Sequence, residues 1–288
     1  MVTPFDGDLK IDWNQTARLI DELIETQKSD GLVIAGTTGE SPTLSDEEKL
    51  ELFRFAVRQA NGRAKIIAGT GSNDTAHSIH LSREAEKLGV DGIMLVSPYY
   101  SRTSQEGLLA HFRAVASSVS LPIMIYNIPS RTGVNIETKT MLALAETPNV
   151  VAVKESSGDL DQMSAILAGA PEGFLLYSGD DSLTLPALSI GAHGIVSVTS
   201  HLVGKSMKEM IDAHLSGRPE RAAKLHLQLS PMFKGMFFGP KQRMVNPVPV
   251  KHALKVKGLD CGGVRLPLVG VTAEEAAFIE SLVASYES

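Results

Sequence analysis

The chain has 288 residues, of which 43% are hydrophobic and 21% charged, values typical of a globular protein with a large core. Its net charge is -6 and no stretch concentrates Lys and Arg, so nucleic acid is excluded as a partner. The longest apolar runs are far shorter than the ~20 residues of a membrane helix, and we expect no membrane protein. Because the single Cys261 cannot form an internal disulfide and the start does not resemble a secretory signal, we expect a cytoplasmic location.

Short apolar strands alternate with amphipathic helices through most of the chain. Eight strands are predicted, at residues 2–3, 32–35, 65–68, 92–96, 123–126, 150–153, 174–177 and 194–198. Helices are predicted at residues 13–28, 46–60, 75–88, 104–118, 137–145, 159–169, 181–190 and 203–216. Capping boxes are predicted to begin three helices, at Ser45, Thr103 and Thr272. Gly89 and Gly191 suit helix ends.

Strands that are apolar throughout belong in a parallel sheet covered on both faces, and eight βα units predict a closed (β/α)8 TIM barrel. An open doubly wound sheet is the alternative, but its glycine-rich phosphate loop is absent after the first strand. After residue 217 only helices are predicted, at residues 219–235, 246–257 and 273–286. We therefore expect a catalytic barrel over residues 1–217 and a C-terminal helical region over residues 218–288.

A lysine stands where the chemistry of a barrel is expected, at the C-terminal end of a strand. Lys154 directly follows the apolar run 150–153, so its amine should emerge at the barrel mouth beside the core. Partial burial there would favour the neutral amine that forms an imine with a ketone. The alternative is a structural lysine paired with Glu155 or with a neighbouring loop.

Other strand ends carry polar residues that each have two interpretations. Thr37 and Thr38 lie between glycines and could present amide donors to a ligand, or simply form a tight turn. Tyr126 and Tyr100 could relay protons, although tyrosines at a barrel rim often only pack. Arg131 offers a planar fork for a carboxylate, or a surface salt bridge.

Two other barrel chemistries fit the residues poorly. Asp180 and Asp181 follow the seventh predicted strand, where a phosphate-binding barrel would place its anion site, and carboxylates repel phosphate. Most histidines lie in predicted helices, and His193 and His201 flank the eighth strand without partner ligands. We expect no metal site.

Five short motifs lie at or shortly after the ends of predicted strands. They are Gly36-Thr-Thr-Gly-Glu-Ser41, Pro98-Tyr-Tyr100 with Gln105-Glu-Gly107, Tyr126-Asn-Ile-Pro-Ser-Arg-Thr-Gly133, Val153-Lys-Glu155 and Gly179-Asp-Asp181. Together they resemble the 4-hydroxy-tetrahydrodipicolinate synthase family, also called dihydrodipicolinate synthases. This family belongs to the pyruvate-dependent class I aldolase superfamily of N-acetylneuraminate lyase, and the match runs from Val2 to the C-terminus.

The resemblance implies a condensation of pyruvate with L-aspartate 4-semialdehyde that begins with an imine between pyruvate and Lys154. It implies a proton relay of Thr38, Tyr126 and Tyr100, the last contributed by a neighbouring subunit. Neither a metal nor an organic cofactor is expected. A homotetramer built as a dimer of dimers is the expected assembly.

The same resemblance assigns the binding of both substrates. Thr37 and Thr38 would hold the pyruvate carboxylate, and Arg131 would receive the carboxylate of L-aspartate 4-semialdehyde. Gly179 and Val196 would line the site through their backbones. Val196 departs from the isoleucine more usual there, and the few residues before position 2 predict a shortened first strand.

Two alternatives remain to be weighed against this function. A related lyase for N-acetylneuraminate or 2-keto-3-deoxygluconate would need groups that bind a polyol, whereas the loop 130–132 offers a cation. A non-catalytic relative would have no use for the lysine, both tyrosines and the threonine pair together.

Feedback by lysine is expected to be weak or absent. Tyr99 and Asn73 match the pocket of lysine-sensitive relatives. However, His77 replaces their glutamate, and Asp46 and Lys49 replace their histidines. A cation and a missing carboxylate both disfavour binding of a second ammonium.

Overall fold

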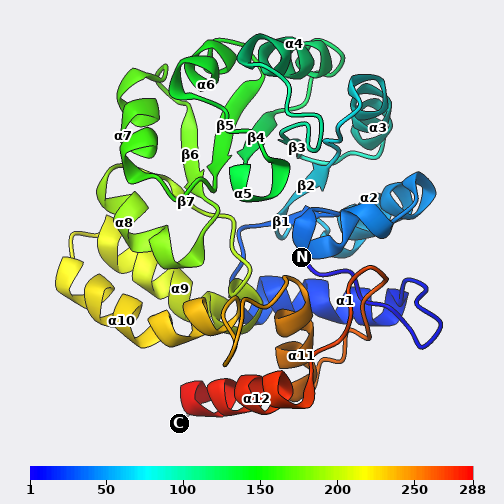
Figure 1. The fold of residues 1–288 in the computed structure, drawn as a ribbon, viewed down its shortest axis with the longest axis vertical. Coiled ribbons are helices and arrows are strands. Elements are labelled where there is room, and N and C mark those ends of the chain that lie inside the picture. Colours follow the sequence, from blue (N-terminus) through cyan, green and yellow to red (C-terminus); the bar gives the residue numbers. More distant parts are fainter. Residues whose placement is uncertain (288) are drawn as a thin grey trace. The chain divides into compact units, whose positions relative to one another are not determined.

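The computed structural model describes residues 1–287, in which parallel strands alternate with helices (Figure 1). The seven strands follow chain order: β1 (Gly31–Ile34), β2 (Lys65–Gly69), β3 (Gly92–Val96), β4 (Ile123–Asn127), β5 (Val150–Glu155), β6 (Leu175–Ser178) and β7 (Gly194–Ile195). From β2 onward each strand pairs in parallel with the next. This arrangement confirms the predicted α/β barrel class.

Most helices lie close to their predicted positions, but the short helix at residues 129–132 was not predicted, because this segment was assigned to a loop. The helices are α1 (Trp13–Asp21), α2 (Asp46–Ala60), α3 (Thr75–Lys87), α4 (Gln105–Ala116), α5 (Pro129–Thr132), α6 (Thr138–Ala145), α7 (Leu160–Gly169), α8 (Thr184–Ser189), α9 (Ser200–Leu215), α10 (Pro219–Gly235), α11 (Val248–Val256) and α12 (Ala273–Glu287). Where one helix was predicted at residues 13–28, α1 passes into a π-helical turn, η1 (Glu22–Thr26). Short 3₁₀ turns are η2 (Thr37–Gly39), η3 (Ser41–Thr43) and η4 (Asp181–Leu183).

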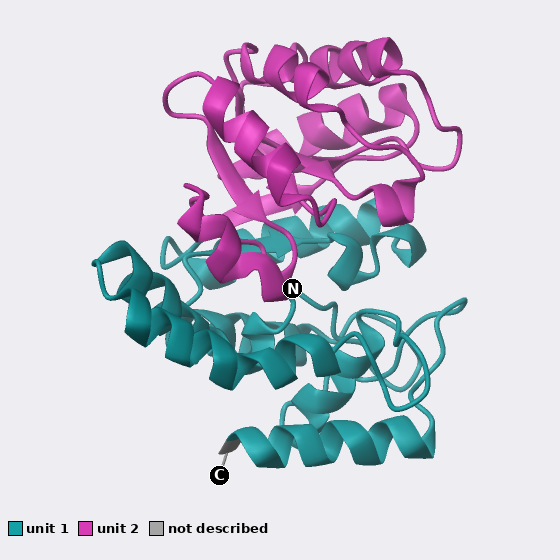
Figure 2. Ribbon diagram, turned by 60° about the vertical axis from the view of Figure 1, so that its left-hand side comes forward, with its two compact units in different colours: residues 1–65, 198–288 teal, residues 66–197 magenta. Residues whose placement is uncertain are grey.

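The chain divides into two compact units, coloured separately in Figure 2. Unit 1 comprises residues 1–65 and 198–288, and unit 2 comprises residues 66–197. In unit 2, the helices α3, α4, α6 and α7 lie outside the strands (Figure 1). The barrel boundary predicted at residue 217 falls inside unit 1 and stays a prediction.

The prediction of a first strand at Val2–Thr3 is wrong. The Val2 amide donates to the His201 imidazole at 3.1 Å, and the Thr3 hydroxyl donates to the Gly39 carbonyl at 2.7 Å. Side chains therefore take the place of the repeating backbone bonds that define a strand. The segment is nevertheless buried, since Val2 is 0% exposed.

Two of the three predicted capping boxes are confirmed. At Ser45 and Thr272, the hydroxyl accepts from the amide three residues later, and the glutamate there accepts from the capping residue's amide. The box predicted at Thr103 is wrong, because Ser104 caps α4 by accepting from the Gly107 amide. Helix α4 thus begins one residue later than that motif implies.

His201 gives unit 1 a pH-dependent stability. Its pKa is lowered to about 3, chiefly by burial and also by the N-terminal ammonium, whereas the bond to the Val198 carbonyl opposes the shift. Between its unfolded pKa of about 6.5 and about 3, the unfolded chain binds a proton that the folded chain does not. The free energy of unfolding should therefore fall as pH drops through this window, by up to about 1.4 kcal/mol per pH unit from this group.

Denaturant titrations between pH 7 and pH 4 test this expectation. His201→Gln should flatten the pH dependence, because the residue that takes up the proton on unfolding is gone. The exposed His80, on α3, provides the control His80→Gln, which should leave the slope unchanged. Equal slopes in wild type and His201→Gln would show that His201 does not carry the effect.

Candidate active site

Lys154 and Tyr126 are neighbours on adjacent strands of unit 2. They stand in register between β4 and β5, so their side chains project from the same face. The Lys154 Nζ lies 4.1 Å from the centroid of the Tyr126 ring. A cation above an aromatic face is attracted by the ring quadrupole. Tyr126 is buried and therefore holds the amine at the C-terminal end of the strands.

The alternative pairing of Lys154 with Glu155 is not formed. Successive strand residues point to opposite faces, and Glu155 lies on the face away from Lys154. Its carboxylate is fully buried and accepts hydrogen bonds from the Asn127 amide, the Gln162 amide and the Ser157 backbone. In the part of the chain that the structure describes, no carboxylate forms an ion pair with the Lys154 amine.

Gly179 packs against the Lys154 side chain in the same unit. A Cβ at this position would lie 2.8 Å from the Lys154 Cε and would overlap the Ser156 hydroxyl. Only glycine leaves room for the lysine side chain. The Val196 amide donates to the Ser178 carbonyl at 2.9 Å, which places Val196 just beyond β7 and beside the end of β6.

Tyr100 lies in a loop of unit 2 and Arg131 in a short helix of the same unit. Tyr100 is 90% exposed with a φ of 79°, and the Ser101 amide donates to the Tyr99 carbonyl at 3.1 Å around it. This is a γ-turn of the rare positive-φ type, a strained conformation of the kind that clusters at functional sites. Arg131 lies exposed on α5, and within residues 1–287 its guanidinium forms no salt bridge.

Thr37 and Thr38 open the 3₁₀ turn η2 in unit 1. As the first residues of this turn, they have amides with no acceptor inside it. The next amides are used, because Gly39 donates to the Gly36 carbonyl and Glu40 to the Thr37 carbonyl. The turn therefore leaves adjacent amide donors, which suit a carboxylate.

A buried ion pair holds this loop. The Lys251 ammonium lies 2.8 Å from the Glu40 carboxylate, and the two side chains are 3% and 0% exposed. Lys251 also donates to the Gly263 carbonyl at 2.6 Å, and the Arg265 amide donates to Glu40 at 3.0 Å. Burial lowers the pKa of Lys251, while Glu40 opposes that shift.

Sequence analysis missed two residues that contact this loop. Besides Lys251, the Asn246 side-chain amide donates to the Thr38 hydroxyl at 2.9 Å. The only local signal was a polar residue beside Pro247 in an apolar segment. Partners 208 positions apart leave no periodic pattern to detect.

Comparison with known proteins shows the family of the chain. The family model described as the dihydrodipicolinate synthetase family matches residues 1–285. The chain belongs to this family.

Relatives in the dihydrodipicolinate synthetase family match over nearly their full lengths. A 4-hydroxy-tetrahydrodipicolinate synthase of Moorella thermoacetica is 57% identical, over 96% of this chain and 92% of the relative. One from Desulforamulus reducens is 54% identical, over 98% of this chain and 94% of the relative. A solved dihydrodipicolinate synthase of Bacillus anthracis is 46% identical with a TM-score of 0.93, over 99% of this chain and 96% of that one.

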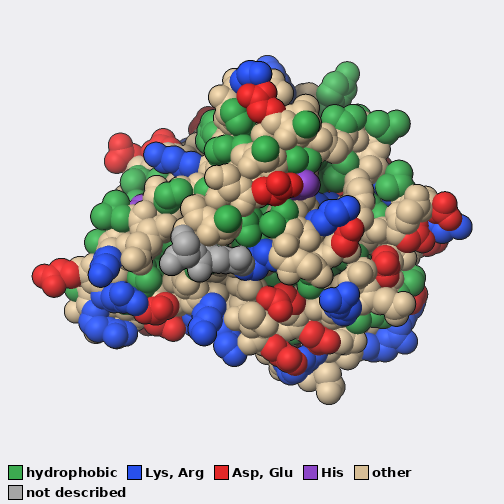
Figure 3. Space-filling model, turned by 90° about the horizontal axis from the view of Figure 1, so that it is seen from below, with side chains coloured by type: hydrophobic (Ala, Val, Ile, Leu, Met, Phe, Trp, Pro, Cys, Tyr) green, Lys and Arg blue, Asp and Glu red, His purple; other side chains and the backbone are tan. Residues whose placement is uncertain are grey.

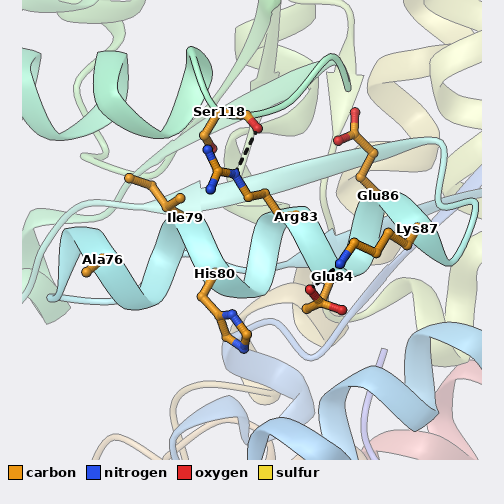
Figure 4. Close-up of a pocket in the computed structure, with 8 residues that line it drawn as sticks. All are labelled: Ala76, Ile79, His80, Arg83, Glu84, Glu86, Lys87 and Ser118. Atoms are coloured by element: carbon orange, nitrogen blue, oxygen red, sulfur yellow. Dashed lines mark hydrogen bonds and ion pairs between the residues drawn. The ribbon is translucent and has the colours of Figure 1, made fainter.

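The hollow in Figure 4 lies away from the strand-end residues of this family member. Its volume is about 560 Å³, and it is lined by α3 side chains and Ser118. Arg83 donates to the Ser118 carbonyl and Lys87 pairs with Glu84, so these charges are already satisfied.

The described residues lack two further features. Residues 1–287 contain no helix long and apolar enough to cross a membrane. They also contain no group of three or more His, Cys, Asp or Glu residues placed to hold a metal ion. On the face seen in Figure 3, acidic and basic side chains are interspersed without an extended basic area.

Proposed function

We propose that the chain condenses pyruvate with L-aspartate 4-semialdehyde to give (2S,4S)-4-hydroxy-2,3,4,5-tetrahydrodipicolinate, in the route to diaminopimelate and lysine. The observation that carries this proposal is the Lys154 amine, which lies over Tyr126 and forms no ion pair with a carboxylate of residues 1–287. An amine that is not locked in an ion pair is available as a nucleophile. The names of the relatives support the same reaction.

In the proposed reaction, the Lys154 amine attacks the ketone of pyruvate and expels water to form an imine. Loss of a methyl proton converts the imine to an enamine, whose carbon attacks the aldehyde of the second substrate. The amine of that substrate then attacks the imine carbon, closes the ring and releases Lys154 as a free amine. The bond to Lys154 is broken again, so the lysine is regenerated. Because the imine itself activates the substrate, neither a metal nor an organic cofactor is part of the proposal.

Tyr126, Thr38 and Tyr100 carry protons in this proposal. Formation of the imine needs proton transfer to the leaving water, which positioned hydroxyl groups supply. Tyr100 is assigned to the site of a neighbouring subunit in a cytoplasmic homotetramer. Its 90% exposure supports this role, because a large aromatic side chain on a strained turn is available to a partner.

Assays with different substrates separate this function from its alternatives. Purified protein should consume pyruvate only when L-aspartate 4-semialdehyde is present, and should leave N-acetylneuraminate and 2-keto-3-deoxygluconate intact. Cleavage of either sugar acid at a comparable kcat/KM would favour the related lyases. Absence of turnover with every substrate would favour a non-catalytic relative.

Arg131→Ala should raise the KM for L-aspartate 4-semialdehyde by about 10- to 100-fold, because a charge-assisted hydrogen bond contributes about 1.5–3 kcal/mol. The KM for pyruvate should change little. Steady-state kinetics with each substrate varied in turn measure both. Arg58→Ala, on the exposed face of α2, is the control and should alter neither value. Equal increases for both substrates would assign Arg131 to holding its loop.

Millimolar lysine should inhibit weakly or not at all. Lys49 is buried, and its Nζ lies 3.5 Å from the Asp46 Oδ1. The Lys49 side chain therefore occupies a position where the ammonium of a lysine ligand would need a carboxylate. His77 contacts the Ser72 hydroxyl at 3.2 Å. A relative from Cyanidioschyzon merolae, 41% identical, was solved with lysine bound. Initial rates at fixed substrates with increasing lysine test this expectation, and inhibition saturating below one millimolar would contradict it.

A further inference from the structure

We propose that Asn246 is a positioning residue that sets the direction in which the Thr38 hydroxyl donates its proton. The inference rests on the proposed function, in which Thr38 belongs to the proton relay. Both residues lie in unit 1, although 208 positions separate them in the chain. Asn246 touches no substrate in this proposal and acts through Thr38.

The contact between the two side chains is short and partly buried. The Asn246 Nδ2 donates to the Thr38 Oγ1 at 2.9 Å, and Asn246 is only 7% exposed. Its other side-chain atom, Oδ1, is buried without a hydrogen-bond partner. A buried acceptor without a partner costs about 1–3 kcal/mol, so packing alone would favour a less polar residue here.

The hydrogen bond from Asn246 determines what the Thr38 hydroxyl can do with its own hydrogen. A threonine hydroxyl has one hydrogen to donate and two lone pairs that accept. Since the Asn246 amide occupies a lone pair, the hydroxyl hydrogen remains available for another acceptor. Asn246 thereby makes Thr38 a donor toward the reaction, because the amide N–H cannot accept that hydrogen.

A second contact from the same segment fixes the loop. Lys251, which lies on α11 five residues after Asn246, pairs with Glu40, two residues after Thr38. The segment 246–251 therefore holds the loop at the reacting hydroxyl and again two residues after it. Removing one partner of such a buried pair is strongly destabilising, so Lys251 is unsuitable as a probe of catalysis and Asn246 is the better choice.

Two substitutions of Asn246 distinguish a role in orienting the Thr38 hydroxyl from a purely structural role. Asn246→Ala removes the donor and should lower kcat about 10- to 100-fold, with the KM for pyruvate changed less than about threefold. Asn246→Asp keeps the shape but offers only acceptors when ionised, so the Thr38 hydroxyl would turn toward it. At pH 8 this variant should have a kcat no higher than that of Asn246→Ala. Its kcat relative to wild type should rise as the pH is lowered and the carboxyl gains a proton.

A purely structural role predicts the opposite order. An isosteric aspartate would then preserve the hydrogen bond and retain near-wild-type kcat at pH 8, which would overturn the proposal. The same result is expected if Thr38 donates to Asn246, so the experiment also decides the polarity of the bond. Because aspartate matches asparagine in volume, this variant answers the question even if Asn246→Ala fails to fold.

A double-mutant cycle with Thr38→Val tests whether Asn246 acts through that hydroxyl. Asn246→Ala should have little further effect on kcat when Thr38 is already valine, and full additivity would contradict the proposal. Asn149→Ala is a matched control, because Asn149 directly precedes β5, at the end far from Lys154, and its side-chain amide donates to three backbone carbonyls in residues 116–121. It should lower the Tm and leave kcat unchanged. The wild-type substrate assays test the function separately, so failure of one idea is distinguishable from failure of the other.

Discussion

Lys154→Ala is expected to reduce turnover to the assay background, a loss of at least about 10⁴-fold, as found when a covalent nucleophile is removed. The reason is that no other group at the strand ends of unit 2 supplies an amine to form the imine. The variant should fold normally, since Lys154 forms no ion pair whose loss would leave a buried charge. Coupled steady-state assays measure the loss.

Lys205→Ala, on the exposed surface of α9, is the matched control and should have wild-type kcat. Thermal melts of both variants check that any loss of activity is not a loss of fold. Turnover within tenfold of wild type in Lys154→Ala would remove the lysine from its assigned role and the imine from the proposed reaction.

The second large effect is expected for Tyr126→Phe. This change removes only the phenolic hydroxyl and keeps the ring that lies 4.1 Å from the lysine amine. Pyruvate should still bind, while kcat should fall about 10²- to 10⁴-fold, the range for loss of a general acid-base group. Pre-steady-state measurement of imine formation, together with steady-state kcat, separates the two stages.

The neighbouring Tyr177, in register with Lys154 on β6, provides a control for Tyr126→Phe. Its ring lies edge-on to His193, and no proton transfer is assigned to it. Tyr177→Phe should therefore leave kcat within about threefold of wild type. Near-wild-type turnover in Tyr126→Phe itself would assign Tyr126 to packing against the lysine alone.

Local signals predicted most of the fold. Helical spacing and apolar runs predicted all helices except α5 and seven of the eight expected strands. The spacing of apolar residues along a segment is visible in the sequence itself. The segment at Val2 failed because its amide binds the distant His201 side chain, which no local pattern reveals. The start of α4 failed because Thr103 and Ser104 are both capping residues, and the structure uses Ser104, which accepts from the Gly107 amide.

The candidate site divides in the same way. Lys154 and Tyr126 could be predicted because each stands at a strand end, and strand alternation already separates Lys154 from Glu155. Asn246 and Lys251 could not, because their roles depend on contacts with a loop more than 200 positions away. Residues that act through long-range contacts need coordinates to be recognised.

Reductive trapping identifies the lysine that forms the imine. Borohydride added to the protein with pyruvate reduces an imine to a stable secondary amine, and peptide mass mapping then locates the modified lysine. One lysine of the wild-type protein, Lys154, should gain the mass of reduced pyruvate. The Lys154→Ala variant should gain none. Modification of another lysine, such as Lys65 or Lys205, with Lys154 unmodified would contradict the assignment of the imine to Lys154.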